Sequence, residues 1–525
     1  MGYFKGGDQM EGTIFSLIPP IVTIAIILIT KRLFLALGIG IAIGALLYNQ
    51  WNIIDSFVNV YHIMADVLIG DGKVLLFVVL IGILSSLLYL SGGIYAFSEW
   101  GVKVAKTRVQ AQMATMLIGF FTWFDDAFSC LFRGSVMRSV TDKYQVSHSK
   151  LSYLIHSTSA PIALLIPISG LAAFITSIIA GVLTDTEITS YQALEAFLLA
   201  IPTNYYTITT IVLVFIVAYF GINVGQMRRD EERAVKEDIL FDTKRGKVPG
   251  SEDTKLPTRN DGKMADLLFP VLTLIIVTVI SAILIGRSSA EGPITAFDVL
   301  INTDIILSLV YGAIAADLVI LTRLLMKKTS GEHLKISTFA GIKTTLPSVI
   351  ILFLALVTAK VISSLGVGNY LATLIDGNLQ LAWLPVIFFV FAAFISYSIG
   401  STLGTAGLMI PIGAEIVATI DVTFLIPVIG AVLAGTVFGE HTSPLSDTTI
   451  LASIGSSVHP IDHMVTQLPY AMLSSVSSIF GFIVLGFTQN IVIGLITAIL
   501  VMVVGAYLFK MRLNKTHTLN GEIAK

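Results

Sequence analysis

Apolar runs close to the length needed to cross a lipid bilayer recur from one end of the chain to the other. Examples are Thr13–Thr30, Phe34–Tyr48, Met264–Gly286 and Ile491–Leu508. A helix needs about 20 apolar residues to cross a hydrocarbon layer of about 30 Å, and there it must satisfy its own backbone hydrogen bonds. The 525 residues are 55% hydrophobic and 13% charged, whereas soluble domains carry about 25% charged residues. These features predict an all-α polytopic membrane protein with about 12–14 transmembrane helices.

A polar segment, residues 228–263, divides the apolar sequence into two parts. It carries ten Lys and Arg residues and lacks apolar periodicity. We therefore expect an N-terminal membrane half (1–227), a charged cytoplasmic linker (228–263) and a C-terminal membrane half (264–525). Cytoplasmic loops are enriched in Lys and Arg, and the basic segments alternate with acidic loops if Gln110–Val136 re-enters the membrane from the cytoplasmic side. This topology predicts a bacterial-type cytoplasmic membrane, with the amino terminus outside and the carboxyl terminus inside.

Several classes of protein are disfavoured by what the sequence lacks. The single cysteine, Cys130, excludes a disulfide framework or a cysteine-built metal site. No GxxxxGK[ST] motif supports an ATP-driven pump, and HExxH and GxSxG are absent. His441, Ser443 and Asp447 lie within seven residues, whereas the members of a hydrolase triad normally come from distant segments. We expect no enzyme, no cofactor and no nucleic-acid partner; the expected partners are the lipid bilayer, transported ions and a second copy in a homodimer.

The two apolar parts carry matching polar interruptions. In the first, GFFTWFDDAFSC (119–130) is followed by HSTSAPIALLIPIS (156–169); in the second, SYSIGSTLGTAGLMIPI (396–412) is followed by EHTSPLSDTTILAS (440–453). Each pair is a polar interruption and then a hydroxyl-rich run with a proline. The charge-derived topology makes the spans before these pairs run in opposite senses. Two inverted repeats with broken or re-entrant helices are typical of secondary transporters, whose sites lie where the broken helices meet.

The first interruption contains two adjacent carboxylates, Asp125 and Asp126, in an otherwise apolar stretch. A charge at the bilayer centre costs roughly 2.5–3.5 kcal/mol on insertion scales, so two charges there need a compensating role. Cation coordination and proton exchange are one such role. Either carboxylate could instead cap a helix or pair with Arg133 or Arg138.

Ser157, Thr158 and Ser159 precede Pro161 in the second interruption of this half. Proline cannot donate a backbone hydrogen bond, so freed carbonyls and the three hydroxyls offer oxygen ligands to an alkali cation. An ordinary proline kink, with the hydroxyls bonded back to the helix, is the alternative. His156 could titrate near physiological pH and act in a gate or proton relay, or be a packed residue.

The run from Glu440 to Ser453 is the richest in polar groups. Pro444 breaks the helix, and Asp447 can bind either a cation or a proton. The neighbouring candidate oxygen ligands are Ser443, Ser446, Thr448 and Thr449. Glu440 and His441 are candidates for gating or proton relay, with a position at the membrane edge as the alternative. A fourth interruption, AIPTNYYTITT, adds Asn204 as a possible amide ligand or packing residue, and GSTLGTAG (400–407) suits an unwound turn or a close helix crossing.

At these residues the sequence resembles the NhaC-type sodium/proton antiporter family of the wider ion transporter superfamily. The resemblance rests on two long blocks, FDDAFSCLFRGSVMRSVTDKYQVSHSKLSYLIHSTSAPIALLIPIS and FGEHTSPLSDTTILASIGSSVHPIDHMVTQLPYAM, and on the order of GSTLGTAGLMIPI and AIPTNYY. It implies ion-handling residues at Asp125, Asp126, Ser157, Thr158, Ser443, Ser446, Asp447 and Thr448. Three positions depart from the pattern that the resemblance leads us to expect. His156 stands in place of an acid, Glu440 in place of Asp, and Leu403 in place of Trp.

The function predicted from these features is exchange of Na⁺, or of Li⁺ or K⁺, for H⁺ by alternating access, as in a secondary transporter of cation homeostasis. The predicted Na⁺ contacts are Asp447, Ser157 and Asp126. Because one aspartate would bind either Na⁺ or a proton, competition for it suffices to couple the two fluxes. The alternative is a Na⁺- or H⁺-coupled carrier of organic acids, of the malate/lactate type, or of amino acids on the same scaffold. A passive channel is disfavoured because it needs no inverted halves with broken helices.

Overall fold

The structure is a computed structural model of the chain and describes residues 13–30, 32–123, 125–242, 257–289, 303–367, 370 and 380–523. These residues form helices and turns and contain no strand. The helices before the polar segment's centre are α1 (Ile18–Thr30), α2 (Leu33–Tyr48), α3 (Ile53–Ser91), α4 (Gly93–Val104), α5 (Arg108–Gly119), α6 (Asp126–Lys143), α7 (His148–His156), α8 (Ala160–Leu165), α9 (Gly170–Asp185), α10 (Ala193–Ala200), α11 (Tyr205–Phe220) and α12 (Gly225–Glu237). Those after it are α13 (Met264–Ser289), α15 (Ile305–Met326), α16 (Gly331–Ser364), α18 (Leu384–Ile399), α19 (Thr402–Ile420), α20 (Leu425–Thr442), α21 (Asp447–Ser456), α22 (Pro460–Thr488) and α23 (Ile491–Ile523).

About half of these helices have the length and apolar composition of membrane spans. Within the described ranges, eleven helical segments meet that description, or twelve if His148–Leu165 and Gly170–Asp185, bent by 46°, form one span. Shorter apolar helices cover Ile14–Ile26, Phe34–Tyr48 and Ala193–Thr203. The predicted all-α polytopic membrane fold is therefore confirmed.

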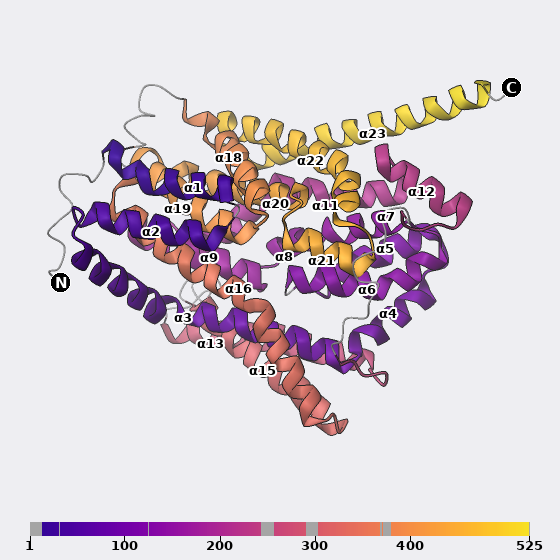
Figure 1. Cartoon of the computed structure of the whole chain (residues 1–525), viewed down its shortest axis with the longest axis horizontal. Helices are drawn as coiled ribbons and strands as arrows, with labels where there is room; N and C mark the ends of the chain where they lie inside the picture. Colours follow the sequence, from indigo (N-terminus) through magenta and orange to yellow (C-terminus); the bar gives the residue numbers. More distant parts are fainter. Residues whose placement is uncertain are drawn as a thin grey trace.

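Two helical hairpins and two broken helices occupy corresponding places in the two halves (Figure 1). The α5–α6 hairpin precedes the broken pair α7–α8, and the α18–α19 hairpin precedes the broken pair α20–α21. Gly400, at the turn between α18 and α19, has a φ of 76°, which L side chains rarely adopt. A Cβ there would lie 2.6 Å from the backbone nitrogen of Ser446. The tip of this hairpin therefore rests against the α20–α21 break, as the predicted broken helices require.

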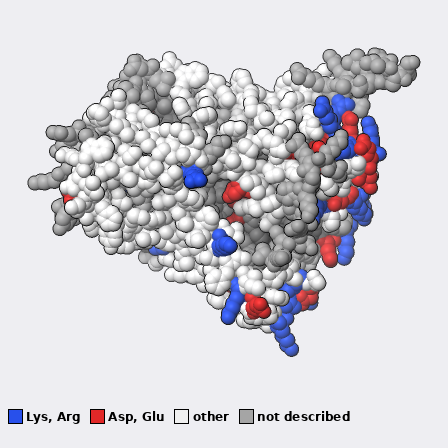
Figure 2. All heavy atoms as spheres, viewed as in Figure 1, with Lys and Arg blue, Asp and Glu red and all other residues white. Residues whose placement is uncertain are grey.

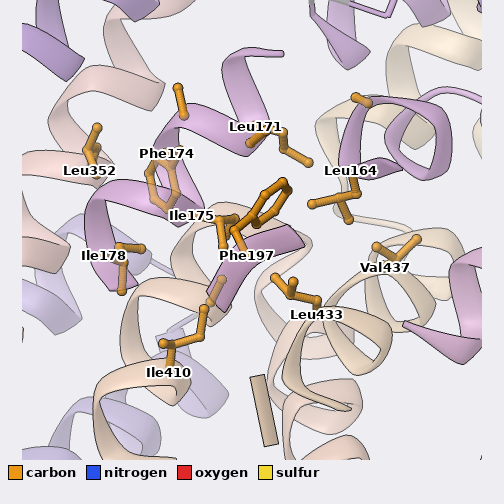
Figure 3. Packing of buried hydrophobic residues seen from close by; sticks show 14 of the residues in the cluster. Leu164, Leu171, Phe174, Ile175, Ile178, Phe197, Leu352, Ile410, Leu433 and Val437 are labelled. Atoms are coloured by element: carbon orange, nitrogen blue, oxygen red, sulfur yellow. The ribbon is translucent and has the colours of Figure 1, made fainter. Parts of the chain in front are cut away.

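The two halves share one core because helices of each half pack against helices of the other. The first half's α6 packs along α21 of the second half, and α19 of the second half packs against α9 of the first. Figure 3 shows Phe197 of α10 among Leu164, Leu171 and Ile175, with Leu433 of α20 nearby. Van der Waals packing of such side chains holds membrane helices together, because lipid tails are as apolar as the side chains themselves.

Charged side chains gather at one end of the molecule, over α12 and the end of the α15–α16 hairpin (Figure 2). The first described helix, α1, and the end of the last, α23, lie toward opposite ends of the molecule (Figure 1). The first part of the predicted linker forms helix α12, which is fastened to α5 by an ion pair of 2.6 Å between Arg108 and Glu231. Residues 243–256 of that segment lie outside the described residues. The division into two halves and a linker stays a prediction.

Candidate functional site

The break between α20 and α21 carries the most polar part of the site. Ser443 follows the last residue of α20, and Ser446 precedes α21, with Pro444 between them. The Ser446 hydroxyl accepts a hydrogen bond of 3.3 Å from the Thr449 backbone N–H, which is a helix N-cap. Ser443, Ser446 and Thr449 are buried. The break therefore holds hydroxyl oxygens inside a protein whose surroundings are apolar.

Asp447 is the first residue of α21, and its side chain is exposed. Its Oδ1 accepts a hydrogen bond of 2.8 Å from the Thr448 backbone N–H. A carboxylate at a helix N-terminus is stabilised by the partial positive charge of the unpaired N–H groups. The predicted ion ligand thus lies at an accessible helix N-terminus.

Glu440, in the last turn of α20, is only 2% exposed. One carboxylate oxygen accepts a hydrogen bond from the hydroxyl of Thr448, and the other accepts one from the hydroxyl of Thr402 at the start of α19. A buried carboxylate is tolerated only when hydrogen bonds or an opposite charge compensate it. Glu440 is buried among the helices and joins the α20–α21 break to the tip of the α18–α19 hairpin, while a position at the membrane edge stays an alternative.

Three buried histidines lie beside this carboxylate: His156 at the end of α7, His441 in α20 and His463 in α22. The ring centroids of His156 and His441 are 4.6 Å apart, and those of His156 and His463 are 5.0 Å apart. Nδ1 of His441 is 3.0 Å from the Tyr206 hydroxyl. Gln467 donates from Nε2 to the His441 backbone oxygen at 2.9 Å. His441 is therefore buried among the helices as well.

A hydrogen-bonded chain links Glu440 to two of these histidines. The Thr448 hydroxyl donates to Glu440, and its oxygen is 3.0 Å from Nε2 of His156. Nδ1 of the same ring is 2.9 Å from Nε2 of His463. Nδ1 of His463 is buried without a hydrogen-bond partner within the described part of the chain. A row of this kind can pass a proton, because each member can both donate and accept.

Asp125 and Asp126 lie at the tip of the α5–α6 hairpin and are half-buried. Asp126 begins α6, and its Oδ1 accepts a hydrogen bond of 2.9 Å from the Ala127 backbone N–H. Its carboxylate interacts electrostatically with those of Glu440, Asp125 and Asp447. Asp126 is therefore within electrostatic reach of three other carboxylates, and we call these four, two from each half of the chain, the carboxylate cluster.

The α7–α8 break supplies the other predicted hydroxyls, Ser157, Thr158 and Ser159, all buried. Thr158 and Ser159 accept hydrogen bonds from the guanidinium of Arg133 in α6. Arg133 forms no ion pair with a carboxylate of the described chain, and Arg138 donates to the Ser457 hydroxyl. Within the described residues, Asp126 forms no ion pair with either arginine.

Asn204 caps α11, and its Oδ1 accepts a hydrogen bond of 3.3 Å from the Thr207 backbone N–H. No group of three His, Cys, Asp or Glu side chains in the described ranges is arranged to hold a metal ion. Alkali ions in transporters also take hydroxyl and backbone carbonyl oxygens. Na⁺ binding at Asp447, Ser157 and Asp126, and an ion-ligand role of Asn204, therefore stay predictions.

Four residues of the site were not singled out from the sequence: Thr402, Tyr206, His463 and Gln467. His463 and Gln467 are four residues apart and so share one face of α22. Polar residues at this spacing in an apolar span indicate a polar helix face, and this pattern could have identified both residues from the sequence. Thr402 and Tyr206 had no such signal, because their contacts join distant parts of the chain.

Comparison with known proteins gives matches over most of the chain. A sequence model of the "Na+/H+ antiporter family" matches residues 162–487. A Haemophilus influenzae protein described as uncharacterized is 34% identical over 517 residues, which are 96% of this chain and 97% of that protein. Two shorter matches are an arginine/ornithine antiporter of Halobacterium salinarum (36% identity; 19% of this chain and 22% of the relative) and a malate-2H(+)/Na(+)-lactate antiporter of Bacillus subtilis (39%; 16% and 18%).

The fold is also similar to a solved structure, that of Neisseria gonorrhoeae MtrF, described as illuminating a class of antimetabolite efflux pumps. The TM-score is 0.52 at 15% sequence identity, over 82% of this chain and 84% of that one. At this identity the likeness concerns the fold alone.

Proposed function

The chain belongs to the Na⁺/H⁺ antiporter family and is a secondary antiporter, and from this premise we propose that it exchanges Na⁺ for H⁺ by alternating access. Li⁺ and K⁺ are further candidate ions. The observation that carries the proposal is the carboxylate cluster, with Glu440 held between the hydroxyls of Thr402 and Thr448.

The carboxylates of the cluster repel one another, and this repulsion is strongest at the buried Glu440, because charges interact more strongly at low dielectric than in water. Their repulsion is relieved either by a bound cation or by protons on some of the oxygens. When a cation is bound, no proton is needed to relieve the repulsion between the carboxylates. When the carboxylates are protonated, they bind the cation more weakly. Such mutual exclusion at one cluster is sufficient to couple the two fluxes in opposite directions.

We assign the two ligands to different members of the cluster. Asp447 is exposed, and buried hydroxyls of Ser443 and Ser446 lie beside it at the α20–α21 break. This favours Asp447 as the first contact of the cation, with Ser157 and Asp126 as further predicted contacts. Glu440 is buried and bonded to Thr448, so the chain through His156 to His463 supplies its proton.

The charged end of the molecule supports an orientation across the membrane. Lys and Arg are enriched on the cytoplasmic side of membrane proteins. With the charged end over α12 in the cytoplasm of a bacterial-type cell, the carboxyl terminus lies inside and the amino terminus outside. The predicted homodimer remains a prediction.

A coupled carrier of organic acids or amino acids is the second candidate. It is favoured by the two shorter relatives, which are an arginine/ornithine antiporter and a malate-2H(+)/Na(+)-lactate antiporter. Such a carrier would use the same hairpin tips and broken helices.

The test uses purified protein in liposomes that contain a pH-sensitive dye. Na⁺, Li⁺ and K⁺ salts are added first, and then malate, lactate, arginine and ornithine. Proton movement driven by Na⁺ alone, abolished in Asp447→Asn, is the expected result. If the cations alone move no protons at any pH near neutrality and an organic solute does, the second candidate replaces the first.

A further inference from the structure

Arg133 of α6 is fully buried at the break between α7 and α8. Its Nη1 donates to the Thr158 hydroxyl oxygen at 2.7 Å, and its Nη2 donates to the Ile155 backbone oxygen at 2.8 Å and to the Ser159 hydroxyl oxygen. Its Nε donates to the Ser129 backbone oxygen at 3.3 Å. The guanidinium is thus enclosed by oxygens, three of which come from the broken helix.

This positive charge has no carboxylate ion-pair partner within the described chain. Burying a charge without a partner is costly unless hydrogen bonds satisfy it. The Thr158 hydroxyl donates to the Leu154 carbonyl and that of Ser159 donates to the Ile155 carbonyl, which leaves their lone pairs for the guanidinium. Hydroxyl lone pairs and an unwound-helix carbonyl are the ligands that an alkali cation takes in a transporter.

The equivalent break in the second half is built differently. Thr158–Ser159 correspond to Thr442–Ser443 in the two hydroxyl-rich runs, so His156 corresponds to Glu440. The second break therefore has a carboxylate, and no arginine of the described residues contacts that carboxylate. The first has an arginine, and a histidine in place of the acid. The Arg133 charge acts electrostatically on the His156 ring.

We propose that the Arg133 guanidinium is a built-in cation that permanently fills the site formed by Thr158 and Ser159 at the α7–α8 break, so that a mobile cation binds only at the carboxylate cluster. This inference rests on the proposed function in one respect: it assumes that the protein transports a cation. Arg133 acts on transport by fixing the number of mobile cations, and it keeps Thr158 and Ser159 from binding one.

The test measures thermal unfolding of the purified protein against NaCl concentration, with choline chloride holding the ionic strength constant. Arg133→Gln removes the charge and leaves the oxygens of Thr158 and Ser159 free. Its midpoint is expected to rise with Na⁺ by about 2–3 °C more than that of the wild type when the site is well saturated. Arg138→Gln is the matched control, because it removes a charge from the same helix away from the break. It and Arg133→Lys are expected to show the wild-type response.

If Arg133→Gln does not fold without a cation, recovery of folded protein in NaCl but not in choline chloride is the expected result. The proposal is overturned if Arg133→Gln responds to Na⁺ only as the wild type does, or if NaCl does not recover it. A failure of the proposed function can be distinguished from a failure of this inference, because the two are measured in different experiments. Wild-type protein that moves no protons with Na⁺ contradicts that function, while an added Na⁺ response in Arg133→Gln still supports the built-in cation.

Discussion

The backbone of Gly134 in α6 lies directly against that of Gly455 in α21. A Cβ on Gly134 would be 2.5 Å from the carbonyl carbon of Gly455. Gly134 is eight residues after Asp126, and Gly455 is eight residues after Asp447. This equal spacing brings the first residues of the two helices to a similar distance from the crossing, in agreement with the electrostatic interaction of Asp126 with Asp447. The glycine crossing therefore sets how closely the two halves bring their carboxylates together.

Gly134→Ala is expected to force α6 and α21 apart and to reduce exchange about 10-fold or more, since small displacements at a site are costly. Gly181→Ala in α9 is the matched control. Its nearest neighbour would be Leu356 at 4.0 Å, so it should exchange normally. Transport by reconstituted protein checks both variants, and normal exchange by Gly134→Ala would contradict the role of the crossing.

Glu440→Gln keeps the shape of the side chain but removes its charge and its exchangeable proton. We expect exchange to fall about 100-fold or more, because loss of a proton-transferring group commonly costs that much. Glu99→Gln changes an exposed carboxylate of α4 and should leave exchange unchanged. Equal activity of the two variants in the dye assay would exclude Glu440 as the proton carrier.

His156→Leu interrupts the hydrogen-bonded chain between Thr448 and His463. It should slow exchange roughly 10- to 100-fold without an equal loss of apparent Na⁺ affinity, because the ring serves the proton and does not bind the cation. His62→Gln, at an exposed position of α3, is the control. A variant that loses Na⁺ affinity with an unchanged maximal rate would instead make His156 part of the cation site.

Asp266 of α13 forms ion pairs with Arg323 of α15 at 2.7 Å and with Lys327, the residue after α15, at 2.5 Å, and its side chain is 1% exposed. Asp266→Ala should lower the free energy of unfolding by about 3–5 kcal/mol, because removing one partner of a buried ion pair leaves the others uncompensated. Lys73→Ala breaks the exposed pair with Asp304 and should cost about 0–1 kcal/mol. Thermal unfolding of the purified variants compares the two, and similar losses would contradict the assignment.

The helices and their breaks were predictable from the sequence because both follow from local composition. Apolar length predicts spans, and Pro161 and Pro444 mark the two broken helices. The burial of Glu440 was not predictable in this way. It depends on Thr402, a residue 38 positions away that reaches the carboxylate only after α19 packs against α20.

Arg133 illustrates the same limit. A charge in an apolar span predicts a compensating partner, and the nearby carboxylates were the obvious choice. The structure instead gives it hydroxyl and carbonyl oxygens of the α7–α8 break. Which partner a buried charge receives depends on how helices cross, and one sequence contains no direct record of that. His463 lies more than 300 residues from His156 and joins the chain for the same reason.

The most direct test of shared binding measures the Na⁺ concentration that gives half-maximal exchange in liposomes at a series of pH values. If Na⁺ and one proton compete for the carboxylate cluster, protonation of the cluster raises the Na⁺ concentration needed for half-maximal exchange. Below the pKa of the cluster, this concentration should rise about tenfold for each unit of pH decrease, while the maximal rate changes little. A half-maximal Na⁺ concentration that does not vary with pH would contradict competition at one cluster, and with it the proposed mechanism of exchange.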